Sequence, residues 1–437
     1  MTDTICAIAT PPGQGGVGIV RVSGPEIETI ACALIDCLPP ERRAVLVAVR
    51  DAGGQIIDRG LALHFPAPHS FTGEHVLELQ LHGSPVVLEL VLRAAVAAGA
   101  RRAGPGEFSQ RAFVNDKLDL AQAEAIADLI AASSERAARA AGRSLEGEFS
   151  RRVQALVEAV TALRVYVEAA LDFPDEDIDF LVEGDVSQRL IELQRQSAAL
   201  LDQARAGRLL NDGLQIAIIG KPNAGKSSLF NALARRDAAI VTEIPGTTRD
   251  VVRETVQLAG LTVSLADTAG LRDSADPVEI EGVRRAQAEL AAADLVLWVV
   301  DATNSTTEHA PKTSVPVIRI LNKIDRVAIE AGSTAGEVRL SALTGDGLEQ
   351  LDARVAEALA VNEAGAGEFS ARGRHVEQIS LAGRHLQQGS AALAETGSGE
   401  LLAEELRVAA DALGEITGRI HSDELLGQIF SSFCIGK

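Results

Sequence analysis

Residues 220–227 read Gly-Lys-Pro-Asn-Ala-Gly-Lys-Ser, which fits the pattern GxxxxGK[ST] and constrains the fold more than any other segment. The apolar run 214–219 predicts a buried strand before it, and 227–233 predicts the first turns of a helix after it. A strand, a glycine-rich turn and a helix N-terminus form an anion site, because backbone N–H groups and the helix dipole face bound phosphates. In such a site Lys226 contacts the β- and γ-phosphates and Ser227 supplies an oxygen to Mg²⁺. The segment therefore predicts a nucleoside triphosphate site.

Two later segments indicate guanine as the base. Asn322-Lys323-Ile324-Asp325 follows the strand-like run 315–321. Its aspartate can accept two hydrogen bonds from the N1–H and 2-amino edge of guanine, which adenine does not offer. Ser341-Ala342 follows the run 337–340, and its backbone is expected to contact the guanine oxygen. Leu343 stands next, where GTPases often carry lysine.

Between these segments lie two candidate switches. Asp267-Thr268-Ala269-Gly270 follows a predicted strand, so Asp267 can hold the Mg²⁺ shell and the Gly270 N–H can sense the γ-phosphate. The loop 245–250 carries Thr248, whose hydroxyl can reach Mg²⁺ while GTP is bound. The expected nucleotide contacts are Gly220, Asn223, Ala224, Gly225, Lys226, Ser227, Ser228, Thr242, Glu243, Ile244, Pro245, Gly246, Thr247, Thr248, Asp267, Thr268, Ala269, Gly270, Asn322, Lys323, Asp325, Ser341 and Ala342.

The catalytic pattern differs from that of many small GTPases. Leu271 follows the DTAG glycine, where many of them place a glutamine that orients the attacking water. Leucine cannot hydrogen-bond water, so the water must be oriented from elsewhere, and the loop 273–279 supplies carboxylates. Asn223, inside the P-loop, is a neutral oxygen donor placed to hold a monovalent cation that offsets transition-state charge.

Composition limits the remaining possibilities. The chain has 437 residues, enough for about three domains, and a formal net charge of −20, which disfavours broad electrostatic binding of nucleic acid by the chain alone. Its four cysteines show no CxxC spacing and are expected to be reduced thiols. The N-terminus lacks a signal-peptide pattern, and no stretch approaches 18 apolar residues. We therefore expect a cytoplasmic protein that does not enter membranes.

The first 117 residues mix short β-like runs with two helical ones and predict a small α+β domain. The glycine-rich segment 13–18 formally matches GxGxxG, but a strand rather than a helix follows it. A dinucleotide fingerprint needs that helix, so we interpret the segment as a β-turn-β.

Two helical stretches flank the nucleotide domain. Apolar residues at helical spacing follow one face over 153–171 and again over 402–420, and each stripe must bury that face. The simplest arrangement packs the two stripes together, with 213–359 inserted between them. The expected division is therefore 1–117, 118–212, 213–359 and 360–437. The acidic stretch 173–179 reads as a solvated loop, with metal binding as the alternative.

Four motifs resemble those of the MnmE family of tRNA modification GTPases, also called TrmE. They are ATPPG at 9–13, PGEFSQRAF at 105–113, NDKLDLAQA at 115–123 and FCIGK at 433–437. The resemblance implies an N-terminal α+β folate-binding and dimerising domain, an all-α helical domain formed from both flanks, and an inserted Ras-like P-loop GTPase domain. It also implies a homodimer and a flavoprotein partner, MnmG, in a heterotetrameric or larger complex. Together the pair installs a carboxymethylaminomethyl-type group on the wobble uridine of certain tRNAs.

The resemblance also assigns roles to single residues. The family's K⁺ ligands correspond to Asn223, Thr242, Ile244 and Thr247, and its Mg²⁺ ligands to Ser227 and Thr248. The acidic residue that orients the hydrolytic water corresponds to Glu279. Contacts to a one-carbon folate correspond to Arg21, Glu78, Lys117 and Lys437. Cys434 matches the family's terminal cysteine, a candidate reactive thiol, and Phe71 replaces a tyrosine.

A GTPase switch that acts in ribosome assembly shares all five nucleotide motifs and is the alternative. Such a protein is expected to carry a basic RNA-binding appendage. Residues 361–437 contain no dense cluster of lysine and arginine, which favours the first interpretation.

Overall fold

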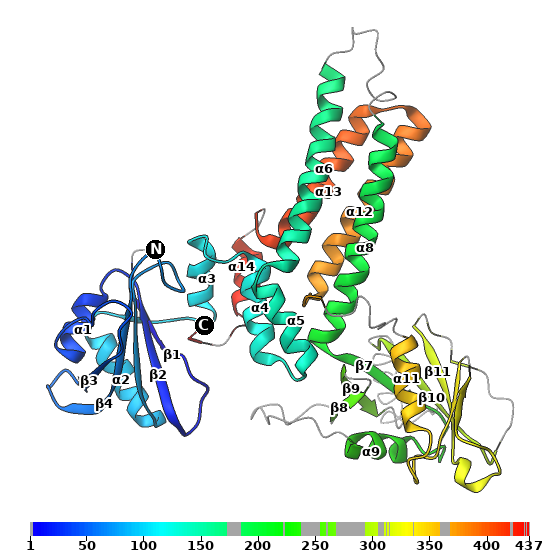
Figure 1. The fold of residues 1–437 in the computed structure, drawn as a ribbon, viewed down its shortest axis with the longest axis horizontal. Helices are drawn as coiled ribbons and strands as arrows, with labels where there is room; N and C mark the ends of the chain where they lie inside the picture. The colour runs from blue at the N-terminus through cyan, green and yellow to red at the C-terminus, as the bar shows by residue number, and fades with distance from the viewer. Residues whose placement is uncertain are drawn as a thin grey trace, which may run out of the picture. The chain divides into compact units, whose positions relative to one another are not determined.

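The structure is a computed structural model that forms two compact units. Unit 1 comprises 1–127, 145–162 and 407–437, and unit 2 comprises 128–144 and 163–406. Figure 1 shows their strands and helices. The residues described are 3–172, 185–221, 223–236, 254–258, 261–267, 293–304, 310–311, 313, 315–334, 336–358, 368–419, 423–431, 433 and 435–436.

Unit 1 is built on a six-stranded mixed sheet with the order β3-β4-β5-β2-β1-β6. Its strands are β1 Ile5–Ile8, β2 Gly15–Ser23, β3 Val45–Arg50, β4 Ile56–Phe65, β5 Val76–Gly83 and β6 Arg101–Arg102. Helices α1 (Ile27–Ile35) and α2 (Pro85–Ala97) bury their apolar side chains with those of the sheet in one core. The arrangement confirms the predicted α+β character of this part of the chain.

The predicted strands and helices of this region are present, with ends shifted by one or two residues. β2 begins at Gly15 and pairs antiparallel with β1, so the glycine-rich segment leads into a strand and not a helix, as expected. The sequence analysis missed β4, because Asp58, Arg59 and Gly60 interrupt its apolar pattern. Gly60 is needed there, since an added Cβ would lie 2.1 Å from the Gln80 oxygen of β5.

The C-terminal residues complete unit 1. Helix α14 (Asp423–Ser431) and Phe433 share an apolar cluster with the start of helix α4 (Leu120–Ala131) and with Phe113 of helix α3 (Glu107–Val114). Beyond this cluster, Ile435 forms a bridge with Pro105, so the tail runs beside the entry to α3.

Unit 2 contains a seven-stranded sheet with the order β12-β13-β11-β10-β7-β9-β8. Its strands are β7 Leu214–Ile219, β8 Glu254–Leu258, β9 Leu261–Asp267, β10 Leu295–Asp301, β11 Val317–Asn322, β12 Gly332–Thr334 and β13 Glu337–Arg339. The central strands are parallel, and the first six residues of β10 are all buried, as a strand covered on both faces requires. Helices α9 (Lys226–Arg236) and α11 (Leu348–Ala358) add apolar side chains to the same core.

The remaining helices are α5 Glu135–Leu145, α6 Glu148–Asp172, α8 Val186–Asp212, α12 Gly373–Thr396, α13 Gly399–Thr417 and the short 3₁₀ helix η1 Ile324–Arg326. α8 packs along α12, and Gly389 of α12 lets Leu402 of α13 approach closely. Both predicted apolar stripes are largely buried on α6 and α13. Direct packing of the α6 stripe against the α13 stripe remains a prediction. The acidic stretch 173–179, predicted to be a solvated loop, lies outside the described residues.

In the part of the chain that the structure describes, no helix is both long enough and apolar enough to cross a membrane.

Candidate functional site

The P-loop of unit 2 lies where the sequence predicts it, between the end of β7 at Ile219 and the start of α9 at Lys226. Gly225 has φ +95°, and an added Cβ would lie 2.2 Å from Nδ2 of Asn322, so only glycine fits. Lys226 Nζ donates to the Gly220 oxygen over 2.9 Å, while Ser227, in the first turn of α9, is exposed. The loop therefore offers a phosphate cradle with an accessible hydroxyl for a cation such as Mg²⁺.

Asn322 joins the P-loop to the segment that is expected to contact the base. The side chain is buried, with 1 % of its surface exposed. Its Nδ2 donates to the Ala224 oxygen over 3.0 Å, and its Oδ1 accepts from the Ala342 N–H over 3.0 Å. Both ends of the amide are satisfied, so one residue fixes the spacing between the phosphate cradle and the 341–342 loop.

Lys323 forms a second bridge on the same side of the sheet. Its Nζ donates to the Asn223 oxygen over 2.5 Å and lies 2.6 Å from Oδ2 of Asp301. Partial burial raises the pKa of Asp301, but hydrogen bonds from Lys323 and Thr303 outweigh it and hold the pKa at about 2. Asp301 is therefore ionised at neutral pH and holds Lys323 against the P-loop.

The expected guanine contacts lie together at the edge of a cavity of about 840 Å³, lined by Asp325, Ala342 and Leu343 among others. Ser341 Oγ donates to Oδ1 of Asp325 over 2.6 Å, which orients the carboxylate. Leu343, found where GTPases often carry lysine, is 80 % exposed. The Asp325 carboxylate is thus available to a base at this edge, while the Ala342 N–H is engaged by Asn322.

Other predicted nucleotide contacts cannot be placed. The segment 242–248, the segment 268–270 and Glu279 lie outside the described residues, and of Asp267 only its place at the end of β9 is described. Among the residues described, His, Cys, Asp and Glu form no group of three or more that could hold a metal ion.

A second group of predicted residues lies in unit 1. Arg21 of β2 and Glu78 of β5 face each other across the strand pair, with Arg21 Nη2 2.8 Å from Oε1 of Glu78. Both side chains are largely buried, and the Arg21 guanidinium lies over the rings of Phe71 and Phe108, 5.5 and 5.7 Å from their centroids. Arg21 Nη1 also donates to the Gly436 oxygen over 3.4 Å, which brings the C-terminal tail to this pair.

Lys117 lies near the same loop as Phe71, because an added Cβ on Gly73 would meet its Cε at 3.0 Å. The structure therefore brings Arg21 and Glu78 into contact and places Lys117 beside the loop next to them. Lys437 and Cys434 lie outside the described residues.

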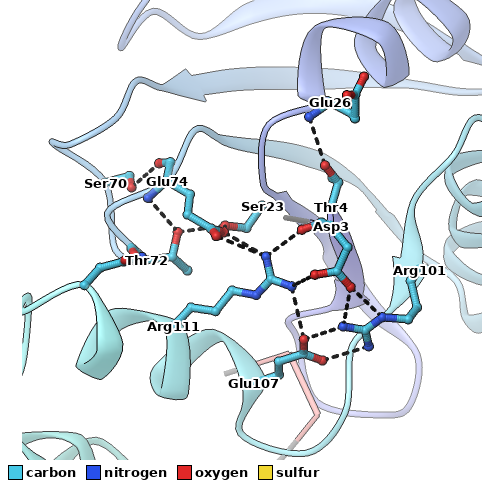
Figure 2. A network of polar contacts seen from close by, with 11 residues as sticks. Asp3, Thr4, Ser23, Glu26, Ser70, Thr72, Glu74, Arg101, Glu107 and Arg111 are labelled. Atoms are coloured by element: carbon cyan, nitrogen blue, oxygen red, sulfur yellow. Dashed lines mark hydrogen bonds and ion pairs between the residues drawn. The ribbon is translucent and has the colours of Figure 1, made fainter. Parts of the chain in front are cut away.

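A charge network around the buried Arg111, which the sequence analysis did not predict, supports this site (Figure 2). Arg111 of α3, 1 % exposed, lies 2.9 Å from Asp3, 3.1 Å from Glu74 and 3.2 Å from Glu107. Arg101 shares Asp3 and Glu107 with it. The hydrogen bond from Arg101 is the main cause that lowers the pKa of Asp3. Because Phe108 follows Glu107 directly, the network also sets where Phe108 meets Arg21.

Comparison with known proteins bears on the whole chain. Residues 4–117 match the family described as GTP-binding protein TrmE N-terminus, and residues 120–434 match the MnmE helical domain. A relative in Marinobacter nauticus, named tRNA modification GTPase MnmE, is 53 % identical over 453 residues, which cover 100 % of this chain and 99 % of that protein. The protein of the same name in Thiobacillus denitrificans is 51 % identical over 440 residues, covering 100 % and 98 %.

The chain belongs to the MnmE family. The resemblance found in its motifs is confirmed, and the chain is a GTPase of three structural parts: an N-terminal α+β domain, a helical domain and a P-loop nucleotide domain. Among solved structures, Era of Aquifex aeolicus is 25 % identical with a TM-score of 0.27, over 39 % of this chain and 66 % of that one. A score this low adds nothing to the assignment.

Two features of this MnmE family member were missed from sequence. Asp301 ends a buried strand beside Asn322, and that position at the carboxyl edge of a parallel sheet was an available signal. The role of Arg111 left no signal in the sequence, because its partners Asp3, Glu74 and Glu107 are scattered along the chain.

Proposed function

We propose that this protein is a K⁺-stimulated GTPase that, with an MnmG-like flavoprotein, modifies the wobble uridine of certain tRNAs using a one-carbon folate. The proposal extends family membership, since the full-length relatives are named tRNA modification GTPases. The observation that carries it is the Asn322 amide, which hydrogen-bonds both the P-loop and the segment expected to contact the base. The same chain also carries the Arg21–Glu78 pair.

The described contacts support the GTP half of the proposal. We assign the phosphates to the P-loop N–H groups and Lys226, the N1–H and 2-amino edge of guanine to Asp325, and the guanine oxygen to the 341–342 backbone. Ser227 and Thr248 are the proposed Mg²⁺ ligands, and the exposed hard-oxygen donor at Ser227 fits that ion. Mg²⁺ would neutralise charge on the β- and γ-phosphate oxygens.

We assign the K⁺ site to Asn223, Thr242, Ile244 and Thr247. Asn223 fits this role, since it is exposed and has φ +63° in the P-loop. Turnover measured in matched KCl and NaCl tests the assignment, with faster hydrolysis expected in KCl. Equal rates in the two salts would remove K⁺ from the mechanism.

We assign water orientation to Glu279, because Leu271 cannot hydrogen-bond water. Glu279→Ala is expected to bind GTP normally and to hydrolyse it about 10²–10⁴-fold more slowly, the usual contribution of a positioned acid–base group. Glu395→Ala, at an exposed glutamate of α12, is the matched control. Wild-type turnover in Glu279→Ala would exclude the role.

We propose that Arg21, Glu78, Lys117 and Lys437 bind the folate. The Arg21–Glu78 pair presents donors beside an acceptor, which complements the mixed hydrogen-bonding edge of a pterin ring. Because Glu78 already neutralises Arg21, the pair is poorly suited to a carboxylate. Lys117 is better suited to the glutamate end of the folate.

The proposed whole assembly is a cytoplasmic homodimer, formed through residues 1–117, that joins the flavoprotein in a heterotetramer or larger complex and acts on tRNA. We keep the division 1–117, 118–212, 213–359 and 360–437 as the proposed domain boundaries.

Nucleoside analysis of tRNA from a strain lacking this protein tests the function. Unchanged wobble uridines would overturn the tRNA role and leave the GTPase assignment intact. Co-purification with a ribosomal subunit instead of a flavoprotein would favour the ribosome-assembly alternative.

A further inference from the structure

A pocket of about 1010 Å³ lies in unit 1, and of its lining residues the function proposed above uses Lys117 alone. Its wall is formed by α3, the turn from α3 to α4, the first turns of α6, and Gly418 and Arg419 after α13. The lining mixes apolar and polar side chains, and Lys117 is one of them. The pocket therefore adjoins the site proposed for folate.

Two cations of this pocket remain available. Lys117 and Arg419 both line it and are exposed. Within the described part of the chain, neither side chain takes part in a hydrogen bond or an ion pair. Arg151, a third cation of the lining, is already held 2.8 Å from Glu148.

Two of the three carboxylates in the lining are engaged. Oδ1 of Asp119 accepts from the Gln122 N–H over 2.8 Å, and Glu158 accepts from Gln154 over 2.6 Å. These donors are neutral amides, so both carboxylates keep their charge, and with Asp116 the lining carries three carboxylates against the three cations Lys117, Arg151 and Arg419. A lining of about zero net charge is more attractive to an anion than the protein as a whole, whose net charge is −20.

A third observation is an unsatisfied polar atom in the wall. Ser150, in the first turn of α6, is 9 % exposed, and its Oγ has no hydrogen-bond partner. A buried hydroxyl without a partner costs free energy, which a ligand that hydrogen-bonds it would recover. Ser150 also lies at the positive end of the helix dipole, which favours negative charge.

Lys117 connects the pocket with the Arg21–Glu78 pair. Its side chain runs past Gly73, two residues after Phe71, and the Phe71 ring lies 5.5 Å from the Arg21 guanidinium. A ligand whose ring lies at the pair and whose glutamate reaches Lys117 would continue into the pocket.

We propose that the pocket binds the γ-linked oligoglutamate tail of the folate. The tail carries one carboxylate per residue, which suits Lys117 and Arg419, and its amide links suit the hydroxyl of Ser150 and the amides of the glutamines in the wall. This inference rests on the proposed folate function of the same site. It predicts a preference for polyglutamylated folate.

The experiment compares the dissociation constants of 5-formyltetrahydrofolate carrying one and five glutamates, on the full-length protein by calorimetry. Wild type is expected to bind the pentaglutamate about fivefold more tightly, because the exposed Arg419–carboxylate contact is open only to the longer tail and contributes up to about 1 kcal/mol. In Arg419→Gln this ratio is expected to fall to about twofold or less. Raising the salt concentration is expected to shrink the ratio as well.

Arg139→Gln, at an exposed arginine of α5 paired with Glu135, is the matched control and is expected to keep the wild-type ratio. Equal affinities for the two folates in wild type would overturn the tail site, and so would an unchanged ratio in Arg419→Gln. If neither folate binds, the proposed folate function itself fails, and this result is distinct from the other two.

Discussion

Asp301 shows how one carboxylate can organise a nucleotide site through a neighbouring lysine. It holds the Lys323 ammonium at 2.6 Å, and the same ammonium donates to the Asn223 oxygen of the P-loop. Without Asp301, Lys323 would lose the group that fixes its direction. We therefore regard Asp301 as a positioning residue for the P-loop.

Asp301→Ala is expected to weaken GTP binding by about tenfold or more, because a hydrogen bond to a charged group contributes about 1.5–3 kcal/mol. Titration with a fluorescent GTP analogue measures the change. Asp301→Asn keeps an acceptor for Lys323 and is expected to lose less, while Asp202→Ala, at an exposed aspartate of α8, serves as the control. An unchanged affinity in Asp301→Ala would contradict the role.

Arg111 is the second residue on which much depends, since its buried guanidinium serves Asp3, Glu74 and Glu107 together. Arg111→Met is expected to lower the free energy of unfolding of unit 1 by about 3–5 kcal/mol, because it leaves partly buried carboxylates without their cation. Denaturant unfolding followed by far-UV circular dichroism measures it. Arg139→Met, which removes an exposed pair, is expected to cost less than about 1 kcal/mol. Similar losses in the two variants would argue against the network.

At the scale of elements, the C-terminal tail depends on a glycine. Gly436 has φ +99°, and an added Cβ would lie 2.3 Å from the Ile8 oxygen of β1. The backbone of the tail thus lies directly against the first strand, beside Arg21.

Gly436→Ala is expected to release the tail at a cost of about 1–3 kcal/mol in local stability, since alanine can neither adopt this φ freely nor avoid the clash. Faster hydrogen exchange at Ile435 and weaker folate binding are the expected readouts. Gly427→Ala in α14, where an added Cβ meets nothing within 4 Å, is the control and should change neither. If the two variants exchange alike, the contact with Ile8 does not hold the tail.

At the scale of the whole molecule, stability should fall with acidification in two steps. Burial is the main cause that lowers the pKa of His64 below 6.5, and the neighbouring His75 lowers it further. A lowered histidine pKa favours the neutral form in the fold, so its contribution is complete above about pH 6.5 and is lost as pH falls below that value. Asp3 and Asp301 also have lowered pKa values, so their contribution is lost below about pH 4.

Thermal unfolding between pH 7.5 and pH 3.5 tests this. The melting temperature is expected to decline slightly between about pH 6.5 and 5 and steeply below about pH 4. In His64→Gln the first decline should disappear and the second should remain. A melting temperature that rises on acidification would contradict the direction of these pKa shifts.

Much of the nucleotide domain could be predicted from sequence because its signals are local. The P-loop needs a strand, a glycine turn and a helix in succession, and 214–233 carry all three within one short segment. Arg21 and Glu78 were found through family resemblance, and their contact follows from the register of β2 on β5. β4 was missed because its pattern is interrupted, although the sheet supplies its partners on both sides.

The sequence by itself determined the nucleotide, the family and the order of the parts, because short motifs with fixed spacing carry that chemistry. Only the tertiary structure decided which distant groups meet: Arg111 with three carboxylates, Lys323 with Asp301, and the tail with the first strand. The physical reason is that ion pairs and close backbone contacts depend on distance in space. When the two partners are far apart in sequence, such contacts leave no periodic pattern in the sequence.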